Sequence, residues 1–113
     1  MLPQNRRLKK ENDIRRVFKE GQTFKSAPLS LKAAANDLGR SRFGFAVPLR
    51  VTKKATSRNK IKRRMSETIR LQLPIIKKGF DVMILVFPGA DKLSFQELKG
   101  TLENLFQKAK LYD

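Results

Sequence analysis

The sequence predicts an α/β sandwich, in which one small sheet is packed against helices. Segments with the helical spacing of apolar residues alternate along the chain with segments in which apolar and polar residues alternate like a strand. Proline and glycine residues separate these segments at regular intervals. A chain of 113 residues has room for one hydrophobic core, so residues 1–113 are expected to form a single domain.

The first expected element is a helix that ends at Gly21, a residue type that commonly stops helices. Ile14, Val17 and Phe18 would share one face of this helix. Acidic side chains lie in its first turns, where the helix dipole favours them.

Two strands are expected at residues 29–33 and 43–47, where apolar side chains recur at every second position. Residues 36–39 are rich in turn-forming types, so we predict a hairpin between these two strands. Residues 23–25 are a candidate for a further edge strand.

The second helix is expected at residues 57–73, because apolar residues recur there at a spacing of four and Pro74 follows. Residues 80–87 are nearly all apolar, which predicts a central strand covered on both faces. A helix between two strands of one sheet implies a crossover connection, so at least one strand pair is expected to be parallel.

The last helix has a clear start, because Ser94 and Glu97 have the spacing of a capping box. Leu93 and Leu98 can form the accompanying hydrophobic staple. Its expected core face consists of Leu98, Leu102, Leu105, Phe106 and Ala109.

The charge predicts a polyanionic partner, because 26 Lys and Arg face 10 Asp and Glu, for a formal net charge of +16. Nucleic acid is the first choice and an anionic membrane the second. The longest apolar run, residues 82–87, is far shorter than the roughly 20 residues of a spanning helix. The first residues have no apolar stretch of the kind that secretory signals carry, so a cytoplasmic location is expected.

The sequence contains neither cysteine nor histidine. Disulfides, thiolate or imidazole metal sites and His-activated nucleophiles are therefore excluded. Two-metal phosphodiester chemistry needs only carboxylates, but the acidic residues are scattered and no paired cluster is evident. We therefore expect no catalytic residue, metal ligand or bound cofactor in this chain.

The densest basic segment spans residues 53–70, with eight basic residues and one acidic residue, Glu67. On a helix, most of these cations would point outward or flank the apolar stripe, where they could contact RNA phosphates. The alternative is a solvated basic helix face, which the near absence of neutralising acids disfavours. The candidate RNA-binding residues are Lys53, Lys54, Arg58, Asn59, Lys60, Lys62, Arg63, Arg64 and Arg70.

Residues 58–63 resemble the R-N-R-I-K-R signature of the bacterial ribonuclease P protein family, and Lys54 matches the lysine upstream of it. Further matches follow in order at residues 7–10 (R-L-K-K), 16–21 (V-F-K-x-G), 41–47 (R-x-G-x-x-V), 80–82 and 93–98. Two positions depart from the family: Lys60 replaces an arginine and so loses its forked donors, and Leu49 stands where a lysine is usual.

The resemblance implies the fold αβββαβα, with a small mixed sheet and a left-handed βαβ crossover. It implies a subunit of the ribonucleoprotein that removes the 5′ leader from precursor tRNA, with catalysis by an RNA subunit that requires Mg²⁺. The protein would bind this RNA and the leader, and would assist substrate and Mg²⁺ binding. The implied partners are the ribonuclease P RNA, at one protein copy per RNA, and precursor tRNA.

The resemblance also implies a cleft between the first helix and the sheet that holds the single-stranded leader. Phe18 is the first candidate there by the V-F-K-x-G match, and the alternative is that Phe18 is a core residue beneath its helix. Weaker candidates are Phe24, Lys25, Lys32 and Arg42. The phenylalanines assigned mainly to the core are Phe43, Phe45, Phe80, Phe87, Phe95 and Phe106.

Two other function classes stay open at this point. A structural RNA-binding protein, such as a ribosomal protein or an RNA chaperone, would share the charge and the general fold type. A self-contained nuclease would need catalytic groups that the composition does not obviously supply. The ordered motifs favour the ribonuclease P subunit over both.

Overall fold

The computed structural model describes residues 2–113. The helices are α1 (Glu11–Glu20), α2 (Ala55–Gln72) and α3 (Phe95–Lys108), with short 3-10 turns at Gln4–Arg6, Leu73–Ile75 and Ala90–Lys92. The strands are β1 (Gln22–Ser26), β2 (Leu29–Ala35), β3 (Arg42–Ala46) and β4 (Phe80–Val86). The expected order αβββαβα is confirmed.

The sheet has the strand order β1-β2-β4-β3. β1 pairs with β2 and β2 pairs with β4 in the antiparallel sense, whereas β3 and β4 are parallel. The mixed sheet and the expected parallel pair are therefore confirmed, with α2 as the crossover between β3 and β4. The left-handed sense of this crossover stays a prediction from the resemblance.

The hairpin predicted around residues 36–39 is wrong, because β4 lies between β2 and β3. The true hairpin joins β1 and β2 through the Ala27–Pro28 turn, whose peptide bond is cis. Residues 36–39 still reverse the chain direction between β2 and β3. The types of residue in a turn do not determine whether the two strands that it joins pair with each other or with a third strand. The apolar strand β4 needs a neighbour on both edges and takes the central place.

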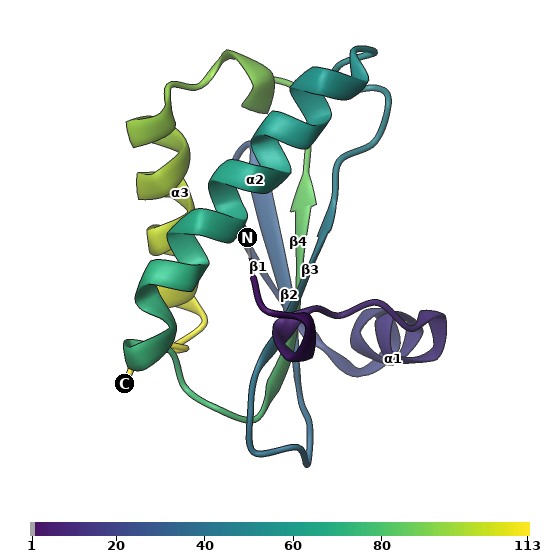
Figure 1. Cartoon of the computed structure of the whole chain (residues 1–113), viewed down its shortest axis with the longest axis vertical. Helices are drawn as coiled ribbons and strands as arrows, with labels where there is room; N and C mark the ends of the chain where they lie inside the picture. The colour runs from purple at the N-terminus through teal and green to yellow at the C-terminus, as the bar shows by residue number, and fades with distance from the viewer. Residues whose placement is uncertain (1) are drawn as a thin grey trace.

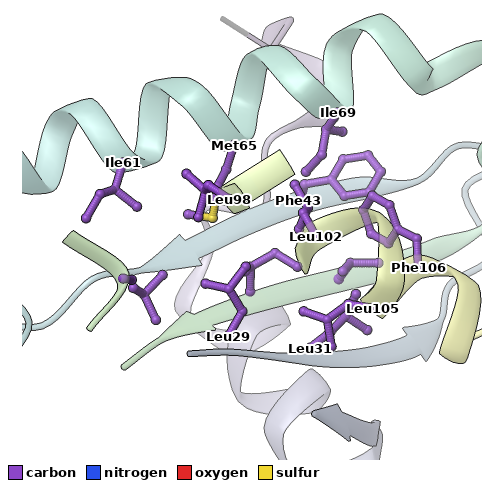
Figure 2. Close-up of a cluster of buried hydrophobic side chains, with 14 of the residues drawn as sticks. Leu29, Leu31, Phe43, Ile61, Met65, Ile69, Leu98, Leu102, Leu105 and Phe106 are labelled. Carbon is purple, nitrogen blue, oxygen red and sulfur yellow. The ribbon is translucent and has the colours of Figure 1, made fainter. Parts of the chain in front are cut away.

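The main core lies between the sheet and the helix pair α2 and α3, which cover one face of it (Figure 1). Strand alternation sends Leu29, Leu31 and Phe43 into this core. Figure 2 shows these side chains facing a row from α2, Ile61, Met65 and Ile69, and a row from α3, Leu98, Leu102, Leu105 and Phe106. The apolar spacing predicted for both helices is thus confirmed.

Helix α1 lies on the opposite face of the sheet, over a much smaller apolar cluster. The buried members of this cluster are Leu8, Val17, Ala34 and Met83. Gly44 lets the N-terminal segment approach β3 closely, because a Cβ there would lie 2.5 Å from the sulfur of Met83 and 3.1 Å from the Leu8 carbonyl oxygen. The segment is held there by a hydrogen bond from the Leu8 amide to the Phe43 carbonyl oxygen, 2.9 Å long.

The ends of the helices follow local chemistry. α2 begins at Ala55 rather than at residue 57, so Lys54 occupies its N-cap position. Its α-helical part ends at Gln72, and the 3-10 turn that contains Pro74 follows directly. The capping box of α3 is confirmed: the Ser94 hydroxyl accepts from the Glu97 amide, and the Glu97 carboxylate accepts from the Ser94 amide.

Candidate RNA interface

Helix α2 carries the basic residues on the side that faces away from the core. Ile61, Met65 and Ile69 are buried and anchor the helix to the sheet. The side chains predicted to point outward, Asn59, Lys60, Arg63 and Arg70, are exposed. We call this surface, made by the predicted RNA-binding residues 53–54, 58–60, 62–64 and 70, the α2 ridge.

Most cations of the α2 ridge are not neutralised within the protein. In the described chain, the side chains of Lys53, Lys54, Lys60, Lys62 and Arg63 form no hydrogen bond or ion pair. Unpaired cations on a fixed helix can exchange water and counterions for phosphate groups, which is the main source of RNA affinity.

Three arginines of the ridge have protein partners. Arg58 donates to the Thr52 carbonyl oxygen at 2.9 Å and so ties the preceding loop to the helix. Arg70 donates through Nε to Glu67 at 3.0 Å, and this hydrogen bond raises the pKa of Arg70 and lowers the pKa of Glu67. Arg64 lies over the Phe95 ring at 5.7 Å.

The start of α2 adds a partial positive charge to the same surface. Lys54 makes no side-chain capping bond, and the first turn contains no acidic residue. The amide groups of this turn are therefore not capped by an N-cap side chain, and the helix dipole points its positive end outward. Both features favour an anion near Lys54.

A second candidate surface is an open cleft of about 400 Å³ between α1 and the β3–β4 edge of the sheet. Phe18 contributes to its wall and is 43% exposed, so the alternative that Phe18 is a core residue is wrong. The cleft is lined by Phe18, Ala46, Val47, Pro48, Arg50, Leu85, Val86 and Phe87. We call this surface the α1 cleft.

Two aromatic rings of the α1 cleft lie next to cations. Lys32 Nζ is 5.7 Å from the centre of the Phe18 ring, and its ammonium also donates to the Thr23 hydroxyl at 3.0 Å. The Arg50 guanidinium is 5.6 Å from the centre of the Phe87 ring. Aromatic faces beside positive charge are what single-stranded nucleic acid needs for base stacking and phosphate contact.

The other residues predicted for the cleft have different places. Phe24 packs against the main core on the opposite face, because it is paired with Leu31 and shares its direction; its prediction as a cleft residue is wrong. Lys25 is exposed and lines a neighbouring hollow of about 300 Å³, which it shares with Pro28 and Phe87.

Arg42 lies on the α1 face, but its charge is neutralised inside the protein. Its guanidinium donates two hydrogen bonds to Asp81, at 2.9 and 2.7 Å, and lies 3.3 Å from Asp13 of α1. The hydrogen bond to Asp81 is the main reason why the pKa of Arg42 is raised. Arg42 therefore fixes the position of α1 and is not available as an open phosphate contact.

Asp81 is the centre of this ion network. Its side chain is fully buried and also accepts hydrogen bonds from Arg16 at 2.9 Å and Asn36 at 2.8 Å. Burial raises the pKa of Asp81, but the hydrogen bonds from Arg42, Asn36 and Arg16 outweigh it and leave the pKa below its ordinary value. Arg16 and Phe18 both belong to α1, so the network holds in place the helix that carries the Phe18 ring.

Sequence reasoning missed three residues with exposed aromatic or cationic groups. Phe87 and Phe95, both assigned to the core, are 38% and 39% exposed, and Arg50 was not a candidate. Phe87 continues the side of β4 that only α1 covers, and strand alternation could have shown this. Of the other phenylalanines assigned to the core, Phe43 and Phe106 are buried, and Phe45 and Phe80 are half-buried.

Residues 2–113 include no helix that is long and apolar enough to cross a membrane. The same residues hold no group of three or more His, Cys, Asp or Glu side chains arranged to bind a metal ion.

Comparison with known proteins identifies relatives over nearly the whole chain. The family model described as Ribonuclease P matches residues 2–110. A ribonuclease P protein component from Synechocystis is 35% identical over 113 residues, which cover 99% of this chain and 91% of the relative. One from Natranaerobius thermophilus is 35% identical over 104 residues, which cover 92% and 90%.

Solved structures agree in fold. The Staphylococcus aureus RNase P protein superposes with a TM-score of 0.88 at 24% identity, covering 96% of this chain and 98% of that one. The Thermotoga maritima RNase P protein gives a TM-score of 0.83 at 30% identity, covering 90% and 98%. With a family model that spans most of its length and relatives above 30% identity, the chain belongs to the ribonuclease P protein family.

Proposed function

We infer that this chain is the protein subunit of ribonuclease P, the ribonucleoprotein that cleaves the 5′ leader from precursor tRNA. The observation that carries this inference is the pairing of the α2 ridge with the aromatic α1 cleft on opposite faces of one sheet. One surface suits an RNA backbone and the other suits a single strand, which are the two RNA elements that such a subunit must hold.

The α2 ridge is our proposed binding surface for the RNA subunit. Its cations would contact phosphates, and the start of α2 would add amide donors. Arg58 and Arg70 would contribute less than Arg63, because part of their hydrogen-bonding capacity is used within the protein. Asn59 has both a donor and an acceptor for a sugar or a base edge.

The α1 cleft is our proposed binding surface for the leader. Phe18 and Phe87 would stack on unpaired bases, while Lys32 and Arg50 would contact the adjoining phosphates. Lys25 would extend the positive surface along the edge of the sheet. Arg42 would act as a positioning residue for α1 rather than as a contact.

We assign the chemistry to the RNA subunit, with Mg²⁺ held by RNA and the protein assisting substrate and metal binding. In this proposal residues 1–113 act as one RNA-binding domain, with one copy per RNA subunit. The reaction is placed in the cytoplasm, where bacterial precursor tRNA is transcribed.

Reconstitution tests the proposal. The purified chain, added to a bacterial ribonuclease P RNA at low Mg²⁺, should raise the rate of precursor-tRNA cleavage at the leader junction. Lack of stimulation, together with tight binding to ribosomal RNA, would favour a structural RNA-binding protein. The protein incubated with substrate and Mg²⁺ but without the RNA subunit should give no cleavage; specific cleavage there would favour a self-contained nuclease.

A further inference from the structure

Phe95 is an exposed aromatic residue whose position the fold does not require. It is the first residue of α3, and 39% of its surface is exposed. The helix start is capped by Ser94 and Glu97, and Leu98 supplies the first buried contact of the helix. Neither the cap nor the core therefore accounts for a phenyl ring at this place.

The ring lies against the basic side of α2. The Arg64 guanidinium is 5.7 Å from the centre of the Phe95 ring. Arg63 is the residue before Arg64 in α2. Together with Glu67 these residues line an open hollow of about 400 Å³. The side chains of Arg63 and Arg64 form no ion pair with any residue among 2–113, whereas the Glu67 carboxylate is held by Arg70.

A flat aromatic ligand that carries a negative charge fits this site. Its ring would stack on Phe95, the guanidinium of Arg64 would cover the stack, and Arg63 would contact the anion. A nucleotide whose base is not paired has this combination of groups, whereas a base inside a duplex cannot present its face. We propose that Phe95 and Arg64 hold one unpaired nucleobase of the RNA subunit, with Arg63 on its phosphate.

The position of the site favours the RNA subunit over the substrate leader. Arg63 and Arg64 belong to the α2 ridge, and a smaller hollow of about 120 Å³ beside Arg64 continues to Ser57 and Lys60 near the start of the helix. Helix α1, whose Phe18 lines the α1 cleft, lies on the other face of the sheet. This inference rests on the proposed assignment of the α2 ridge to the RNA subunit.

The sequence provides a direct reporter, because the chain contains no tryptophan. Phe95→Trp introduces a single indole at the proposed site. We expect titration with the RNA subunit alone to quench its fluorescence as a base stacks on it. Heparin, a polyanion without bases, should bind the protein yet leave the emission nearly unchanged.

Phe87→Trp is the matched control in the α1 cleft. Its fluorescence should respond when leader-bearing precursor tRNA is added to the assembled holoenzyme, and little when the RNA subunit is added alone. If Phe95→Trp instead responds to precursor tRNA and not to the RNA subunit, or is quenched equally by heparin, the proposal is overturned.

Affinity measurements separate this proposal from the one on which it rests. Phe95→Leu should weaken binding of the RNA subunit by about five- to fifty-fold without changing the salt slope, while Phe95→Tyr keeps most of the affinity. If Phe95→Leu binds normally but Arg63→Ala binds weakly, the stacking site is wrong and the ridge assignment survives. If both variants bind normally, the ridge assignment also fails.

Discussion

The two faces of the sheet are held in different ways. On the α2–α3 face, a large cluster of buried aliphatic and aromatic side chains fixes both helices. On the α1 face, the apolar cluster has four buried members among residues 2–113, and the ion pairs of Asp81 with Arg16 and Arg42 also hold α1 to the sheet. The position of the α2 ridge is therefore fixed by apolar packing, whereas the position of the α1 cleft depends on buried polar groups.

This difference separates stability from binding. Substitutions beneath the ridge should unfold the protein and remove both RNA surfaces together. Substitutions in the α1 network or the cleft should affect leader binding with a smaller effect on the rest of the fold.

The largest effect is expected from Phe106→Ala. The ring is fully buried and packs edge-on against Phe43 and Tyr112, at centroid distances of 6.3 and 5.5 Å. Its loss should lower the free energy of unfolding by about 3–5 kcal/mol, since the cavity cannot fully collapse. Urea denaturation followed by circular dichroism measures this, and a change below about 1 kcal/mol would show that the core does not carry the fold.

Asp81→Asn should come next, because it removes the charge that Arg42 and Arg16 share. We expect a loss of about 2–3 kcal/mol at neutral pH, with α1 loosened more than α2. Hydrogen exchange resolves the two helices, and equal loss of protection in both would contradict the comparison.

The same network predicts a pH dependence. Because the pKa of Asp81 is lowered by folding, its contribution is fully present above the ordinary carboxyl pKa of about 4 and is lost as the pH falls through the lower folded value. Stability of the wild-type protein should fall on acidification below about pH 4 more steeply than that of Asp81→Asn. Parallel pH curves for the two proteins would assign the acid sensitivity to other carboxylates.

Phe18→Ala should leave the stability almost unchanged, because the ring is 43% exposed. It should weaken the binding of leader-bearing precursor tRNA to the holoenzyme by about 1–2 kcal/mol, the scale of one stacked base. Mature tRNA should bind as before. Equal weakening for both tRNAs would mean that the α1 cleft does not hold the leader.

Arg63→Ala is expected to have the smallest effect. It should lower the salt slope of RNA-subunit binding by roughly one phosphate contact, while Arg63→Lys should keep the slope. Arg70→Ala is the matched comparison. Arg70 is already paired with Glu67, so its removal should change the salt slope less than the removal of Arg63. A larger change at Arg70 than at Arg63 would mean that protein ion pairs do not reduce RNA contact.

Most of the fold could be predicted from local patterns. Helix spacing and strand alternation depend on neighbours along the chain, and the capping box at Ser94 needs only Glu97 three residues later. The pairing of β2 with β4 could not be predicted in this way, because the partners are about 50 residues apart and compete with the nearer β3.

The candidate site was also predictable only where it depends on residues close together in the sequence. The ridge follows from one helix, and its outward side chains lie where helical spacing places them. The roles of Arg42 and Phe95 depend on side chains from distant segments, Asp81 and Arg64. Asp81 is a carboxylate at the start of the apolar strand β4, and a buried carboxylate there was a signal that a cation must pair with it.

The central claim is that one sheet carries two independent RNA surfaces, and one titration tests it most directly. The binding of precursor tRNAs with successively longer leaders is measured for holoenzymes assembled with the wild-type chain, Phe18→Ala and Arg63→Ala, each at saturating protein. We predict that affinity rises with leader length for wild type and Arg63→Ala, but stays nearly flat for Phe18→Ala. The same rise in all three holoenzymes would contradict the account.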